Sequence, residues 1–266
     1  MEWFSGRAVP LPIMAGLIVA GLIVAGCGDG GGPRATATVT GSPPTTSLPP
    51  PTTITPGPRP RDVLVAGGYQ PLWPFSGPEE VAAWQRSYRA DGRQAWRLDA
   101  ARTAIAFTRD YLGFTEIGQA VTTVSQGRHA RVHVGFRGEE GPRPLVAAVV
   151  HLVRYGSGGD APWEVVGTDD TSFSLTEPGY GARVGSPVTV GGRISGVDES
   201  IRIQVRGPGA AEPLGESCCV GAGGTNTPWS GEVAFTAIPG RTLTIVASTG
   251  GHVAAVERFA VTGVAT

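Results

Sequence analysis

Residues 145–155, LVAAVVHLVRY, decide the fold class of the region around them. An extended chain turns alternate side chains to opposite faces, and residues 145–153 are apolar on both faces apart from His151. Because a strand with two apolar faces is covered on both sides, we expect it at the centre of a sheet. His151 is then expected to be a hydrogen-bonded core histidine rather than a catalytic base.

Three neighbouring stretches carry the same signal, with turn residues between them. They are predicted as strands: residues 120–125, 130–137 and 163–167. In the second of them, Val132, Val134 and Phe136 share one face. These stretches and the central strand predict an antiparallel, curved sheet.

Two helices are expected before these strands. Residues 76–79, SGPE, combine a hydroxyl cap, an early proline and a following glutamate, and the helix they begin is expected to end at Asp91-Gly92. A second helix is expected from the Asp99 cap to Gly113. Helices followed by an antiparallel sheet predict an α+β domain over residues 63–170. The order of its elements resembles that of NTF2-like and cystatin-like domains.

Residues 171–266 carry no helical signal. They hold short alternating runs, predicted as strands: residues 172–176, 188–194, 201–206, 233–237, 243–247 and 253–261. Such a series predicts an all-β antiparallel sandwich. Residues 173–178 (FSLTEP) and 184–192 (VGSPVTVGG) resemble the opening of the immunoglobulin-like domain that is associated with GerMN domains in bacterial lipoproteins.

That resemblance implies an extracytoplasmic immunoglobulin-like sandwich without known catalysis, of a kind found in germination and envelope proteins. The preceding residues 63–170 do not resemble a GerMN domain. We expect a role in the envelope, either in its maintenance or in sporulation or germination, and the departure from GerMN counts against germination.

The start of the chain has the pattern of an export signal. Arg7 is followed by an uncharged apolar run that ends in Val24-Ala25-Gly26-Cys27, which resembles the lipobox of bacterial lipoproteins. The resemblance implies a signal peptide over residues 1–26 and a lipid-modified Cys27. An uncleaved membrane helix and a secretory signal cleaved without lipidation are the alternatives. Pro10 and Pro12 shorten the run below the roughly 20 residues that a membrane helix needs.

Residues 27–62 are rich in Gly, Pro, Thr and Ser, a composition that predicts a disordered linker. The two acyl chains of a diacylglyceryl group hold a protein stably to a membrane, whereas one chain does not. The predicted location is therefore the outer face of the cytoplasmic membrane, in the cell envelope. The formal net charge of −1 gives no basic surface, so nucleic acid is not an expected partner.

The two remaining cysteines, Cys218 and Cys219, are neighbours in the chain. They are either small side chains near a Gly-rich loop or a vicinal disulfide, formed in an oxidising compartment. Metal binding is not predicted, because structural zinc sites need four ligands at suitable spacings. No cofactor is expected either.

Three residues are candidates for ligand binding. Arg131 and His133 lie on one predicted strand face with His129, and this face is either solvated or a weak anion-binding surface. His129 and His133 are separated by about 13 Å along a strand, too far to chelate one ion. Trp73, in a loop close to Pro71 and Pro74, is either part of the core or an exposed indole that could stack on a glycan.

The sequence carries no nucleophile elbow, P-loop or dinucleotide fingerprint, and no catalytic residue is assigned. The favoured hypothesis is a lipid-anchored module that binds or scaffolds an envelope protein or glycan. The alternative is an enzyme with a small-substrate pocket in the α+β domain. That alternative requires His151, Glu116 or Glu164 to line a cleft together.

Overall fold

The computed structural model describes residues 64–65, 67–138 and 141–266, without the side chains of residues 197–199. By their contacts, the described residues belong to one compact unit. The predicted signal peptide, Cys27 and the linker up to residue 62 lie outside the described residues.

Two α-helices precede the strands, as the sequence predicted. α1 (Pro78–Asp91) has a proline in its first turn and ends at Gly92, whose left-handed backbone (φ 71°) closes the helix. α2 (Ala100–Ala106) is capped by Asp99, whose carboxylate accepts the Arg102 N–H at 3.1 Å.

Two short turns complete the helical part. η2 (Ala95–Leu98) is a 3-10 turn between α1 and α2, and η3 (Phe107–Tyr111) is a π-helical turn that extends α2. The predicted hydroxyl cap of α1 is wrong, because Gly77 precedes the helix and Ser76 instead bonds to the Glu80 side chain.

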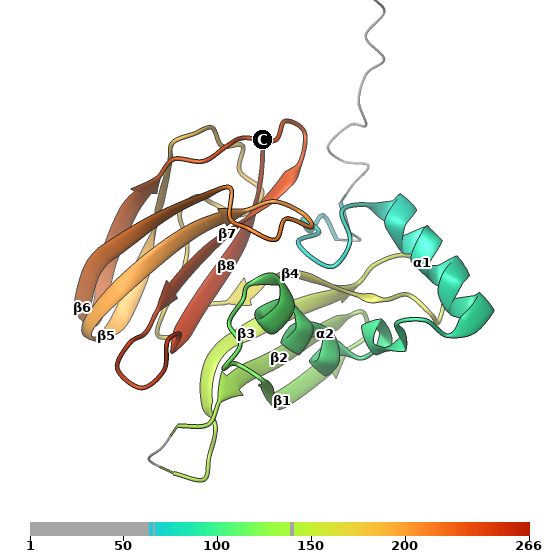
Figure 1. Cartoon of the computed structure of the whole chain (residues 1–266), viewed down its shortest axis with the longest axis horizontal. Helices are drawn as coiled ribbons and strands as arrows, with labels where there is room; N and C mark the ends of the chain where they lie inside the picture. The colour runs from blue at the N-terminus through green and yellow to red at the C-terminus, as the bar shows by residue number, and fades with distance from the viewer. Residues whose placement is uncertain (1–63, 66, 139–140) are drawn as a thin grey trace, which may run out of the picture. The chain divides into compact units, whose positions relative to one another are not determined.

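The first sheet is an antiparallel meander in the order β1-β2-β3-β4 (Figure 1). Its strands are β1 (Gln119–Gln126), β2 (His129–Phe136), β3 (Leu145–Arg154) and β4 (Trp163–Asp169). β3 pairs with β2 on one side and with β4 on the other, so its predicted place inside the sheet is confirmed.

Both faces of this sheet are covered by helical segments. On one face, Leu152 belongs to a core cluster that includes Phe107 of η3. On the other, Val153 clusters with Val81 and Trp84 of α1. The alternation of side chains along β3 thus places neighbouring residues in two different cores, which is why the strand is apolar on both faces apart from His151 and Arg154.

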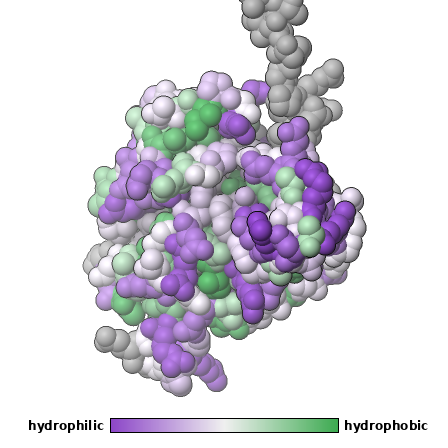
Figure 2. Space-filling model, turned by 45° about the vertical axis from the view of Figure 1, so that its right-hand side comes forward, coloured by the Kyte–Doolittle hydropathy of each residue, from purple (hydrophilic) through white to green (hydrophobic). Residues whose placement is uncertain are grey.

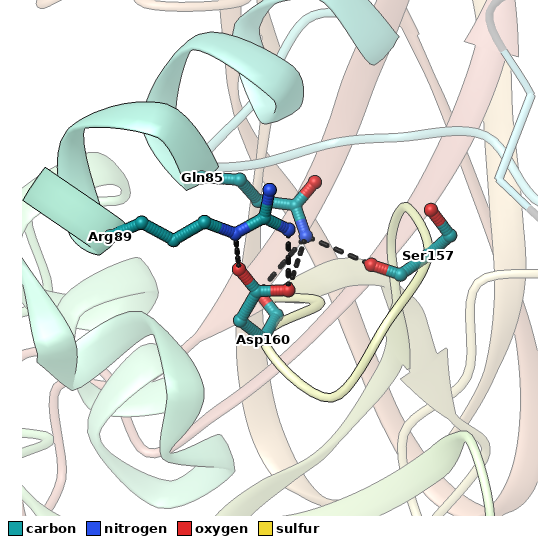
Figure 3. A network of polar contacts seen from close by, with 4 residues as sticks. All are labelled: Gln85, Arg89, Ser157 and Asp160. Carbon is teal, nitrogen blue, oxygen red and sulfur yellow. Dashed lines mark hydrogen bonds and ion pairs between the residues drawn. The ribbon is translucent and has the colours of Figure 1, made fainter.

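α1 is also attached to the turn between β3 and β4 by polar contacts (Figure 3). The Arg89 guanidinium donates two hydrogen bonds to the Asp160 carboxylate, at 2.6 and 3.0 Å. Gln85 donates to the backbone oxygens of Ser157 and Asp160 at 2.9 and 3.2 Å. The hydrogen bond from Arg89 lowers the pKa of Asp160, as expected for a carboxylate that is stabilised in its charged form.

The second sheet has the order β6-β5-β7-β8 (Figure 1). Its strands are β5 (Val188–Arg206), β6 (Gly215–Val233), β7 (Thr242–Thr249) and β8 (Arg258–Ala265). β5 and β6 form one long antiparallel hairpin, and both halves of β5 contribute to one core, Val190 and Ile194 from the first half and Ile203 and Val205 from the second. The segment before β5 joins through two bridges, Phe173 to Ile194 and Glu177 to Gly191.

Several predicted strand bounds in this region are wrong. Residues 188–194 and 201–206 belong to one strand rather than two, and the Gly-rich stretch taken as a loop is mostly β6. β6 escaped prediction because most of its side chains are exposed or half-buried, so that no apolar alternation marks it. Within the described residues, two short α-helices are therefore followed by mostly antiparallel sheets.

The first module, as we name residues 64–170, and the second module, residues 171–266, share a core. One cluster contains Phe107 and Leu152 of the first module together with Val246 of β7 and Phe259 and Val261 of β8. The other side chains of these strands, such as Ile245 and Val264, lie in the core of the second module. β7 and β8 are therefore buried on both faces. The boundary predicted at residue 170 separates the two sheets along the chain, but side chains of both sheets lie in one shared core. As a domain boundary, this position stays a prediction.

None of the helices that the structure describes between residues 64 and 266 is long and apolar enough to cross a membrane.

We expect Gly192→Ala to destabilise the second module. A Cβ at this position of β5 would clash with the carbonyl oxygen of Ser174, in the bridged segment before the strand. Overpacking against backbone costs about 3 kcal/mol at its upper end, and urea unfolding measures it. Gly185→Ala is the matched control, since a Cβ there meets nothing within 4 Å and should change stability by less than about 0.5 kcal/mol. Equal effects of the two variants would contradict the close approach at Gly192.

Candidate functional site

Cys218 and Cys219 form a disulfide on β6. Ile201 of β5 faces Val220 and Ile203 faces Ser217, so the two cysteines together lie opposite the single residue Arg202. This is a β-bulge, which re-aims side chains and interrupts regular pairing. Both cysteines are exposed, so the disulfide is presented on the surface of the strand.

A cavity of about 410 Å³ lies over this disulfide, and we name it the disulfide pocket. Its walls come from four places: the turn at residues 112–114, the outer face of β5, the disulfide of β6, and the end of β7 with the loop that follows. On the face shown in Figure 2, apolar residues are divided by hydrophilic ones. We therefore expect a ligand to bind in a cavity rather than on one broad apolar surface of that face.

One wall of the disulfide pocket is polar. Ser200, Arg202 and Gln204 alternate with buried apolar residues along β5, so all three point to its outer face. Glu216 of β6 binds two of them: Arg202 forms an ion pair with it, and the Gln204 amide donates to its Oε2 at 2.7 Å. Ser248 of β7 lies directly opposite Arg202 in the sheet. The wall therefore offers donors and acceptors side by side.

The other side of the pocket is largely apolar, with Leu112, Phe114, Ala255 and Val256 as lining residues. The Phe114 ring lies 5.4 Å from the Phe259 ring, measured between centroids, which fixes the turn against β8. The disulfide adds two polarisable sulfur atoms to this apolar surface.

Two carboxylates hold the loops that surround the pocket. Glu116 accepts the Ala255 N–H at 3.0 Å and so joins the turn of the first module to the loop between β7 and β8. Within that loop, Glu257 accepts the N–H groups of His252 and Val253 at 2.7 and 2.6 Å. These hydrogen bonds tie the pocket walls to one another.

His129, Arg131 and His133 lie on β2 of the first sheet. His129 Nδ1 lies 3.1 Å from Nε2 of His151 on the next strand, a contact that the sequence analysis did not predict. The Tyr69 ring packs edge-on against both imidazoles, at centroid distances of 5.8 and 5.1 Å. One imidazole donates to the other, so at least one of them is neutral.

Arg131 is not a free anion-binding group, because its Nε lies 2.5 Å from Oδ2 of Asp169. His133 is half-buried beside it, facing Thr122 and Val149 in the neighbouring strands. Among the described residues, no three His, Cys, Asp or Glu side chains are grouped so that they could hold a metal ion.

Trp73 is half-buried and packs among other aromatic residues. Its ring stacks on Trp96 at 5.7 Å and on Tyr111 at 6.4 Å, measured between centroids. Its carbonyl oxygen accepts the Val165 N–H at 2.7 Å, which extends the first sheet by one bridge. These contacts give Trp73 a structural role at the sheet edge.

The three residues named for an enzyme each have partners of their own. Glu164 of β4 is fully buried and accepts the Phe75 N–H at 3.2 Å, while its Oε1 has no hydrogen-bond partner in the described part of the chain. His151 is paired with His129, and Glu116 is bonded to Ala255. The three side chains therefore do not converge on one another.

The sequence analysis missed Arg202, Gln204 and Glu216. The alternation of polar residues with Ile201, Ile203 and Val205 marks an outer face and could have been noticed. The position of Glu216 and of the cysteines opposite this face depends on the register of β6, which the sequence pattern does not show.

No protein-family model, no curated protein and no solved structure matches this chain.

One prediction from these contacts concerns His151. Burial, together with the Arg131 guanidinium, lowers its pKa from 6.5 to about 4. As the pH falls below 6.5 the unfolded chain binds a proton that the folded protein excludes until about pH 4. The free energy of unfolding should therefore decrease by up to about 3 kcal/mol across this window. Urea unfolding at several pH values measures it, and His151→Asn should lose this part of the slope. A variant with the full slope would contradict the assignment.

A second prediction concerns Glu164. Burial raises the pKa of Glu164 well above 4.5, and the Phe75 and Trp73 N–H groups offset this only in part. Because the unfolded chain releases this proton near pH 4.5, the free energy of unfolding falls as the pH rises above that value. Glu164→Gln stays neutral and keeps an acceptor, so its stability relative to the natural protein should grow between pH 5 and pH 7.

Glu164→Ala is the comparison variant for that experiment. It removes the acceptor from buried N–H groups and leaves a cavity, so thermal or urea unfolding should show a loss of about 3 kcal/mol. If Gln and Ala destabilise the protein equally at pH 7, the buried carboxyl does not have the role assigned here.

Proposed function

We propose that this protein is a lipid-anchored extracytoplasmic lipoprotein that binds an envelope protein or glycan. The observation that carries the proposal is the disulfide between Cys218 and Cys219, because disulfides form and persist in oxidising compartments outside the cytoplasm. The lipobox-like sequence ending at Cys27 supports the same location independently. The linker over residues 27–62 would carry the folded part away from the membrane surface.

The finer fold assignments belong to this proposal. The meander β1–β4 with helices on its faces supports an NTF2-like or cystatin-like first domain. The antiparallel strands around the β5–β6 hairpin, and the bridges of the segment before β5, support an immunoglobulin-like sandwich of the GerMN-associated kind over residues 171–266.

The disulfide pocket supports binding rather than catalysis. Among its described lining residues, Arg202 is the one ionisable side chain, because the bonded cysteines do not titrate, and it is paired with Glu216. General acid–base chemistry needs a titratable group that is poised beside the reacting atoms. The pocket instead offers fixed hydrogen-bonding groups next to an apolar wall, which is the composition of a ligand-binding site.

The anchor is tested by mass spectrometry of the membrane fraction. We expect a mature chain that begins at Cys27 and carries a diacylglyceryl group on its sulfur. Cys27→Ser should release the protein from the membrane fraction, whereas the Cys218→Ser/Cys219→Ser variant should stay lipidated and membrane-bound. Recovery of a cytosolic protein that retains residues 1–26, or of an unmodified Cys27, would overturn the proposal.

A further inference from the structure

We infer that the disulfide pocket binds a short neutral saccharide, with the sugar ring over the Cys218–Cys219 disulfide and its hydroxyl groups on the Arg202–Gln204 wall. The inference deepens the proposed function and rests on it in one respect, since a protein in the envelope meets glycans. The site itself is argued from the chemistry of the pocket.

The electrostatics of the wall favour a neutral ligand. The Arg202 charge is balanced by Glu216, with which it forms an ion pair. The next cation, Arg206, is 5% exposed, donates to the carbonyl of Ala211 at 2.8 Å, and lies over the Tyr111 ring. Its charge is therefore directed into the protein. A ligand with a full charge of either sign would find no unpaired countercharge among the pocket's described lining residues.

The hydrogen-bonding groups suit hydroxyl groups, each of which both donates and accepts. Arg202 has five N–H donors, of which the ion pair uses only part, and Glu216 has further acceptor capacity. Gln204 is held in one orientation, because it donates to Glu216 at 2.7 Å and its Oε1 accepts from Arg206 at 3.3 Å. Because this amide is already held in place, little side-chain entropy is lost when a ligand binds, which favours affinity. Ser200 and Ser248 add hydroxyl groups to the same wall.

The apolar side suits the C–H face of a sugar ring. Phe114 and Val256 line it, and the disulfide provides an exposed pair of sulfur atoms between this side and the polar wall. A pyranose ring has the same two-sided character, with C–H bonds on its faces and hydroxyl groups at its rim. Packing the C–H face against sulfur and aromatic carbon removes apolar surface from water.

The size of the pocket agrees with a short saccharide. Its volume of about 410 Å³ falls in the range of about 300–1,000 Å³ that is typical of small-ligand sites. Because Cys218, Cys219, Ser200 and Arg202 are all exposed, the pocket is open on this side, and a longer glycan could continue out of it.

The test uses the full chain in detergent and isothermal titration calorimetry. The neutral probes are N,N′-diacetylchitobiose and cellobiose, and glucuronic acid is the anionic probe. We expect at least one neutral probe to bind, with glucuronic acid at least ten-fold weaker. Gln204→Ala, which removes the fixed amide, should weaken binding about ten-fold, the effect of one lost hydrogen bond. Gln126→Ala, an amide exposed on β1 of the other sheet, should leave binding unchanged.

Cys218→Ser/Cys219→Ser tests the sulfur surface and should also weaken binding about ten-fold. If this variant does not fold, the inference is tested by comparing the saccharide affinity of Gln204→Ala with that of Gln126→Ala. The inference is wrong if neither neutral probe binds, if glucuronic acid binds more tightly, or if Gln204→Ala binds as the natural protein does. A protein that is lipidated at Cys27 and captures an envelope protein, yet binds no probe, would retain the proposed function and lose this inference.

Discussion

The burial of β7 and β8 on both faces is the constraint on which the rest of the structure depends. Alternate side chains of these strands lie in two different cores, with Ile245 and Val264 in one and Val246 and Phe259 in the other. Full burial of such a side chain contributes about 1.5–3 kcal/mol, so neither sheet is complete without its neighbour. Tyr111 adds a polar contact across the same interface, donating to the Gly207 carbonyl at 3.1 Å.

The disulfide pocket is a consequence of where that interface ends. The first module covers the outer face of the second sheet along β7 and β8 but leaves the outer face of β5 and β6 uncovered at Arg202 and Gln204. Two walls line the pocket there: a polar strand face and an apolar turn at residues 112–114. The bulge of Cys218 and Cys219 opposite Arg202 lies between them, because two residues on β6 occupy the space of one on β5.

The polar groups of the first sheet are arranged differently from those of the pocket. Arg131 is paired with Asp169, His151 with His129, and Glu164 is enclosed by the core of the α1 face. Arg131 and His151 have partners within the module, whereas the Oε1 atom of Glu164 has no hydrogen-bond partner among the described residues. In the pocket, Arg202, Gln204 and Glu216 also bond to each other, but they remain open to solvent and keep donors and acceptors free for a ligand.

The sequence by itself determined the order of the elements from α1 to β4. The Asp99 cap, the apolar spacing around residues 78–112 and the alternation within β2 and β3 are local properties, because the period of side-chain exposure follows directly from helix or strand geometry. It also identified Cys218 and Cys219 as a pair with two possible states. Only the tertiary structure decided that the Gly-rich stretch is β6, that His129 meets His151 rather than His133, and that the cysteines face Arg202 across a bulge. Those facts depend on strand register and on which strands become neighbours, and both are set by long-range packing of the two cores rather than by any property of the segments alone.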